Sequence, residues 1–221
     1  MKKILLEQTI WFSSEASKKL KSLEPVFNEL LSVHLAYILG ESGKDYPFWY
    51  GERSHVGFLA AAVWKYGGTA VEEFKTSKSK NKSSKGRCDL WIRINKKIGF
   101  ECEAKRLWVD LDKKVDDLTK KIKNRMDSLK TELNGLDDKY RKLALCFVIP
   151  GIDKSKGIDA MRVKLKQLHG LFKSNKEGNK HSWWDAAVWI GISNADKPFG
   201  KDKYYLPGLL LVIKEKNTRR R

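Results

Sequence analysis

The sequence predicts an α/β protein with a mixed central sheet flanked by helices. Two N-terminal segments have apolar residues at helical spacing, and two later segments alternate as a β-hairpin. A long amphipathic helix followed by a nearly continuous apolar strand then indicates a helical crossover between strands. With 221 residues, of which 41% are hydrophobic, the chain can bury a substantial core.

The first 65 or so residues are predicted to be helical. Apolar residues recur at steps of three and four between Ser17 and Leu39, and again from Glu52 to Tyr66. Gly67 and Gly68 then end the second helix. A short strand is expected over Thr69–Lys75.

The next two segments predict a hairpin that turns at residues 96–97. Cys88–Ile94 places Leu90 and Ile92 on one face, with Asp89 and Trp91 on the other. Ile98–Lys105 alternates in the same way, and its two faces carry, respectively, Phe100, Cys102 and Ala104, and Glu101, Glu103 and Lys105.

The remaining elements follow from longer apolar patterns. An amphipathic helix spans Leu111–Leu136 and a buried strand spans Lys142–Pro150. A helix over 158–172 and strands over 186–192 and 208–213 complete the order α-β-β-β-α-β-α-β-β. We expect residues 1–50 to form a helical segment that packs on an α/β domain of residues 51–221, or the two to form one continuous domain.

The charge is strongly positive and uneven. Lys and Arg number 45 against 27 Asp and Glu, a formal charge of +18. Residues 75–87 hold six basic and no acidic side chains in a polar stretch without periodicity. Such a segment is either a solvated loop or an arm that neutralises the phosphates of a nucleic acid.

The sequence argues against several other classes of protein. The three cysteines (Cys88, Cys102 and Cys146) form no C-x-x-C pair, and the four histidines are scattered, so neither a disulfide framework nor a zinc site is expected. Because no apolar run is long enough to span a bilayer, we expect no membrane association and a reduced, cytoplasmic setting.

The hairpin carries the residues that could bind a metal or take part in a reaction. Pairing its strands about the turn places Asp89 opposite Glu103 or Ala104, so one carboxylate from each strand reaches the same region. Carboxylates about 5 Å apart repel each other, and a divalent cation between them relieves the repulsion. Magnesium favours one or two carboxylates together with waters and phosphate oxygens. Lys105 could hold or deprotonate an attacking water, or stabilise developing negative charge.

Gly86-Arg87-Cys88-Asp89, followed by Glu103-Ala104-Lys105, resembles the motif of the PD-(D/E)XK nucleases, which have the restriction-endonuclease-like fold. The resemblance covers roughly residues 50–150 and implies an α-β-β-β-α-β core, here with an N-terminal helical addition and extra C-terminal strands. It implies that Asp89 and Glu103 bind Mg²⁺, which Mn²⁺ can replace, and that Lys105 assists the attacking water. Cys88 stands where the family often has proline.

Many members of that family add an acidic residue from the first core helix. Glu52 is the first candidate for this role, while Glu72, Glu73 and Glu101 are alternatives. The expected contacts to nucleic acid come from the basic segment, through Lys78, Lys80, Lys82, Lys85 and Arg87.

The leading hypothesis is therefore a metal-dependent nuclease that hydrolyses phosphodiester bonds, with DNA favoured over RNA. A homodimer would cut both strands, since one such site per chain cuts one. The alternative is a non-catalytic nucleic-acid-binding protein with the same fold, which would show no dependence on divalent ions. A protein–protein scaffold that uses the long helix would leave the acidic pair beside Lys105 unexplained.

Overall fold

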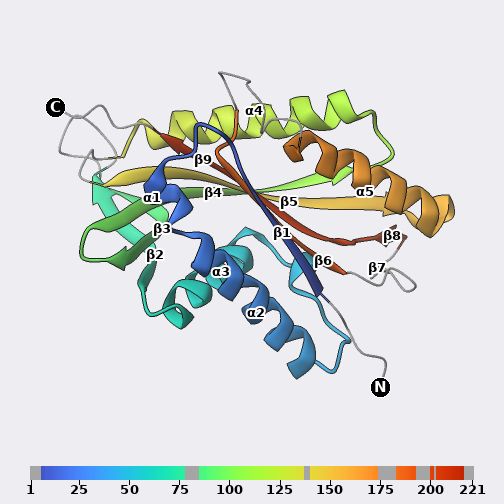
Figure 1. Cartoon of the computed structure of the whole chain (residues 1–221), viewed down its shortest axis with the longest axis horizontal. Coiled ribbons are helices and arrows are strands. Elements are labelled where there is room, and N and C mark those ends of the chain that lie inside the picture. Colours follow the sequence, from blue (N-terminus) through green and yellow to red (C-terminus); the bar gives the residue numbers. More distant parts are fainter. Residues whose placement is uncertain are drawn as a thin grey trace.

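The chain folds as an α/β protein in which helices cover both faces of one mixed sheet (Figure 1). The computed structural model describes residues 6–77, 85–136, 140–173, 183–192, 200–201 and 203–216. The helices, including two short 3₁₀ turns, are α1 (Lys18–Lys21), α2 (Glu24–Gly40), η1 (Pro47–Trp49), α3 (Glu52–Lys65), α4 (Val115–Leu133), η2 (Lys154–Lys156) and α5 (Gly157–Lys173). The strands are β1 (Leu6–Phe12), β2 (Thr69–Ser77), β3 (Lys85–Asn95), β4 (Ile98–Asp110), β5 (Arg141–Asp153), β6 (Ala186–Ile192), β7 (Gly200–Lys201), β8 (Tyr204–Tyr205) and β9 (Gly208–Lys216).

The main path of the sheet has the strand order β1-β6-β9-β5-β4-β3-β2. Only β4 and β5 are parallel neighbours on this path, and α4 forms the crossover between them. The other neighbouring pairs are antiparallel. The short strand β8 pairs with the last two residues of β5, and β7 pairs with β8.

Two apolar layers hold the helices on the sheet. Leu90, Phe100 and Cys102 belong to the layer that α2 and α3 cover, while Cys146 and Val148 belong to the layer under α4 and α5. The steps of three and four along α4 place Leu118, Ile122, Met126, Leu129 and Leu133 in that second layer, as the sequence predicts. The faces predicted for the hairpin are confirmed for the apolar residues of β3 and β4.

The prediction that the chain is helical before the first core strand is wrong at its start. Leu6–Phe12 form β1, which pairs antiparallel with β6 at the edge of the sheet. Trp11 is buried in the layer under α5, where its ring stacks on Phe172. Seven residues are too few for periodicity to separate a strand from a helix, and β1 is fixed by a partner far along the chain.

The single helix predicted over Ser17–Leu39 is also wrong, because it is two helices. The chain turns at Ser22 and Leu23 between α1 and α2, and α2 begins with Pro25 in its first turn. Proline lacks the amide hydrogen that a helix interior needs, so it is tolerated only near a helix start. The strands β3, β4 and β5 are longer than predicted, and Leu111 and Leu136 are buried just outside α4.

Among the residues described, no helix has the length and apolar character that crossing a bilayer requires.

Candidate functional site

Asp89 lies where β3 and β4 stop pairing. The ladder between them ends at Leu90 and Cys102, a register that sets Asp89 opposite Glu103. The carboxylate Oδ2 of Asp89 instead accepts a hydrogen bond of 2.7 Å from the backbone amide of Ala104. The side chain is therefore fixed beside the middle residue of Glu103-Ala104-Lys105.

Glu101 and Glu103 are buried on the other side of β4 from Cys102 and Ala104. Each is only 2% exposed. Burial, followed by the charges of Glu101, Glu103 and Asp89, raises the pKa of the Cys88 thiol to about 12. Three carboxylates thus lie close enough to one thiol to disfavour its ionisation, so this part of the hairpin concentrates negative charge.

Glu52 reaches the same place from α3. It is the first residue of that helix, and its Oε2 accepts a hydrogen bond of 2.8 Å from the amide of Arg106. Its Oε1 lies 3.8 Å from the Lys105 ammonium. The structure therefore brings the predicted Glu52, Asp89 and Lys105 together around the segment 104–106 of β4.

Lys105 lies between carboxylates from two helices. Besides Glu52, its Nζ contacts Glu132 of α4 at 3.3 Å, and it donates a hydrogen bond of 2.9 Å to the carbonyl of Ala104. Burial lowers the pKa of Lys105, but the charges of Glu52, Asp89 and Glu132 outweigh burial and hold the pKa above its ordinary value. Lys105 is therefore an ammonium at neutral pH, which favours stabilisation of negative charge over proton abstraction.

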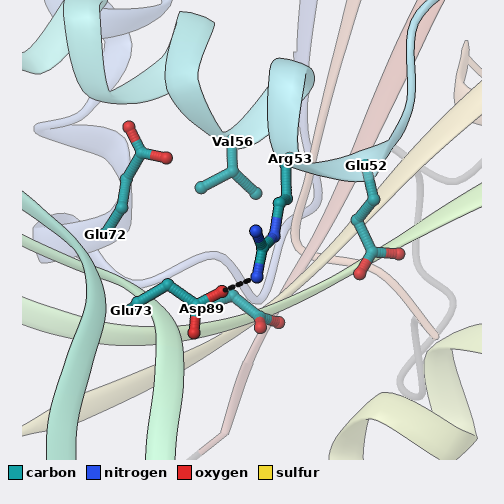
Figure 2. A pocket seen from close by; sticks show the side chains of 6 residues that line it. All are labelled: Glu52, Arg53, Val56, Glu72, Glu73 and Asp89. Atoms are coloured by element: carbon teal, nitrogen blue, oxygen red, sulfur yellow. Dashed lines mark hydrogen bonds and ion pairs between the residues drawn. The ribbon is translucent and has the colours of Figure 1, made fainter.

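A cavity of about 320 Å³ opens between the start of α3 and the strands β2 and β3 (Figure 2). Glu52 and Asp89 line it, together with Arg53, Val56, Glu72 and Glu73. Glu73 has a left-handed backbone with φ of 51°, and its carboxylate contacts Arg53 at 3.1 Å and Arg87 at 3.6 Å. Of the proposed additional carboxylates, Glu52 is the one that contacts Lys105. Glu73 instead forms ion pairs with the two arginines, and Glu101 lies opposite Trp91 in the strand register.

Sequence reasoning missed Glu132 and Arg53. Glu132 lies in the last turn of an amphipathic helix, where its spacing is that of an ordinary solvated face. Arg53 follows Glu52 directly, so the sequence places it near the candidate carboxylate. Its ion pair with Glu73, however, forms only because α3 packs against β2. Neither contact has a local sequence signal.

The residues expected to bind nucleic acid are only partly described. Lys78, Lys80 and Lys82 lie outside the described residues, and Lys85 is described only as a backbone position paired with Ser77. Arg87 is largely exposed and its guanidinium contacts Glu73, at the edge of the cavity.

The donor set suits a hard divalent ion. No group of three His, Cys, Asp or Glu side chains within the described ranges is arranged to hold a metal. Magnesium needs only one or two carboxylates, because waters and phosphate oxygens complete its shell. Asp89 uses one oxygen on the Ala104 amide, so the donors that would fit are its second oxygen and the carboxylate of Glu103, the residue opposite Asp89 in the strand register.

Comparisons with protein-family models, with curated proteins and with solved structures find no match for this chain.

Proposed function

We propose that this protein is a metal-dependent nuclease that hydrolyses phosphodiester bonds of DNA. One observation carries the proposal. The Asp89 carboxylate is held on the amide between Glu103 and Lys105, and Glu52 of α3 contacts the same lysine. Two acidic groups from adjacent strands next to a protonated lysine form a site suited to a divalent ion and to a phosphate that gains negative charge.

The order of elements supports the more specific proposal of a restriction-endonuclease-like fold in the PD-(D/E)XK superfamily. The elements α3, β2, β3, β4, α4 and β5 follow one another as α-β-β-β-α-β. Asp89 lies in the second strand of this series and Glu103-Ala104-Lys105 in the third, as the resemblance requires. The parallel pair β4 and β5, joined through α4, gives the mixed sheet that the resemblance also implies.

In this proposal Asp89 and Glu103 hold the Mg²⁺ ion, which Mn²⁺ can replace. When bound, the ion supplies Lewis-acid stabilisation of the phosphate and lowers the pKa of a water. Lys105, kept protonated by its carboxylate neighbours, offsets charge that develops on the phosphate oxygens. Glu52 positions Lys105, and its bond to the Arg106 amide fixes the start of α3 on β4.

The net charge of +18 supports a polyanionic substrate. The local site is acidic, so the surrounding basic residues must provide most of the affinity for phosphates. Cleavage of both strands would use a homodimer, and the free, buried cysteines are compatible with the proposed reduced cytoplasmic setting.

Digestion of supercoiled plasmid, single-stranded DNA and structured RNA, each with Mg²⁺ and with EDTA, tests the proposal. We expect nicking of the DNA substrates that needs the divalent ion. Binding of all three nucleic acids without metal-dependent cleavage would overturn the proposal and identify a non-catalytic binding protein. Cleavage of RNA alone would support the proposed metal site but would change the proposed substrate from DNA to RNA.

A further inference from the structure

A second cavity lies at the opposite end of the β3–β4 hairpin from Asp89. Its volume is about 280 Å³, and the residues that line it come from α1, from the hairpin turn and from the start of β5. Five of the lining residues are basic: Lys19, Arg93, Lys96, Lys97 and Arg141. None of the described lining residues is acidic. Like charges that converge in this way favour an anion.

The hairpin turn that carries two of these cations is rigidly built. The side-chain Oδ1 of Asn95 accepts hydrogen bonds from the amides of Lys97 at 2.8 Å and Ile98 at 3.0 Å. This turn fixes the backbone from which Lys96 and Lys97 project. On the preceding strand the Arg93 guanidinium lies 4.8 Å from the centre of the Trp91 ring, which orients another cation.

A buried carboxylate orders the rest of the cavity. Glu215 of β9 is 5% exposed and pairs with Arg141. It also accepts a hydrogen bond from Ser17, whose side-chain oxygen caps the helix that carries Lys19. One acidic residue outside the described lining therefore pairs with Arg141 and holds the cap of the helix that carries Lys19, and it can offset only one of the five charges.

We propose that this basic pocket binds phosphates of the nucleic-acid substrate at a distance from the site of cleavage. The choice of substrate rests on the proposed function. Asp89 precedes Asn95 by six residues, about 20 Å along an extended strand. That length corresponds to roughly six phosphates on one DNA strand. The pocket thus holds the backbone of a duplex whose scissile bond lies near Asp89.

Binding of a labelled 20-base-pair duplex in EDTA, measured at several salt concentrations, tests this pocket without cleavage. Lys96→Gln/Lys97→Gln removes two cations from the turn. The matched control, Lys120→Gln/Lys121→Gln, removes two adjacent exposed lysines from α4. We expect the pocket variant to lower the log–log salt slope by about 1.8, or 0.9 for each phosphate contact, and the control to leave it unchanged. Equal slopes in the two variants would overturn the proposal.

Titration with pyrophosphate and ATP distinguishes a site for the phosphates of a DNA backbone from a site for a free polyphosphate. Tight binding of either small anion that the pocket variant abolishes, with duplex affinity unaffected, would identify a free-polyphosphate site and overturn the proposal. The binding assay is also independent of the nuclease proposal. A change in salt slope without metal-dependent nicking would keep the pocket and reject the nuclease, and the reverse result would reject the pocket alone.

Discussion

Lys105 is the residue on which the chemistry of the site depends most. Its ammonium lies 3.8 Å from Glu52 and 3.3 Å from Glu132, so helices on opposite faces of the sheet hold it in place. Because these charges raise its pKa above the ordinary value of a lysine, the group is protonated at neutral pH. In the proposed nuclease reaction, the lysine would act as a fixed positive charge beside the scissile phosphate.

Replacement of this lysine separates a catalytic from a structural role. Lys105→Ala leaves the proposed metal donors in place, so Mg²⁺ binding by calorimetry should survive while the rate of plasmid nicking falls by at least a hundredfold. Lys130→Ala on α4 is the control, because Lys130 pairs only with its helix neighbour Asp127 among the described contacts. If Lys105→Ala nicks DNA at the rate of the control, Lys105 has no part in the reaction.

The stability of the protein should depend on pH through its buried histidines. Burial lowers the pKa of His34 to about 4, and the hydrogen bond that its Nδ1 donates to the Leu30 carbonyl opposes this only in part. An unfolded histidine titrates near 6.5, so between these values the unfolded chain binds more protons than the folded one. The stabilising contribution of neutral His34 is therefore complete above about pH 6.5 and is lost as the pH falls toward 4.

His34→Leu tests this directly. The difference in free energy of unfolding between pH 7.5 and pH 5, measured with urea, should shrink by roughly 1–2 kcal/mol relative to the wild type. His55 and His169 shift in the same direction, so some pH dependence remains in the variant. An unchanged difference between the two pH values would show that folding does not lower the pKa of His34.

Among the elements, the turn between α3 and β2 fixes the helix that carries Glu52. A Cβ built on Gly68 would come within 2.7 Å of the Arg93 carbonyl oxygen and 2.9 Å of a Val63 methyl group. The first of these neighbours is the backbone of β3, which cannot yield without disturbing the sheet. The absence of a side chain at residue 68 thus lets α3 pack closely on the strand that bears Asp89.

Gly68→Ala should therefore destabilise the protein by roughly 1–3 kcal/mol, the range for overpacking a close contact. Gly40→Ala at the end of α2 is the matched control, because a Cβ there meets no atom within 4 Å. That change should be neutral or slightly stabilising. Urea unfolding compares the two, and equal stability would show that the turn relaxes freely.

Elements with strong periodicity were predictable from sequence, and the segments fixed by distant partners were not. The alternation of β3 and β4 places Asp89 near Glu103-Ala104-Lys105 without knowledge of any other strand. By contrast, β1 depends on β6, and Glu132 reaches Lys105 only because α4 returns across the sheet. The sequence therefore indicates the hairpin and its carboxylates, while the helix contacts that orient the lysine require the fold.

At the scale of the whole molecule, the positive charge should make nucleic-acid binding strongly dependent on salt. The segment of residues 78–85 contributes Lys78, Lys80, Lys82 and Lys85 and leads into the strand with Asp89. Replacing all four with glutamine should weaken binding to duplex DNA and lower the log–log salt slope by up to about 3.6. A variant with glutamine at Lys113, Lys114, Lys120 and Lys121 has the same net charge, and an equal fall in both would assign the effect to net charge alone.

The rate of plasmid nicking by Asp89→Asn, with Mg²⁺ present, tests the central claim most directly. Asparagine keeps an oxygen to accept the bond from the Ala104 amide, so the fold is retained while the proposed metal donor loses its charge. Asp127→Asn, on the exposed side of α4, is the control of equal charge change. We predict metal-dependent nicking by the wild type and by Asp127→Asn, and its loss in Asp89→Asn. Wild-type activity in Asp89→Asn would contradict the assignment of this site.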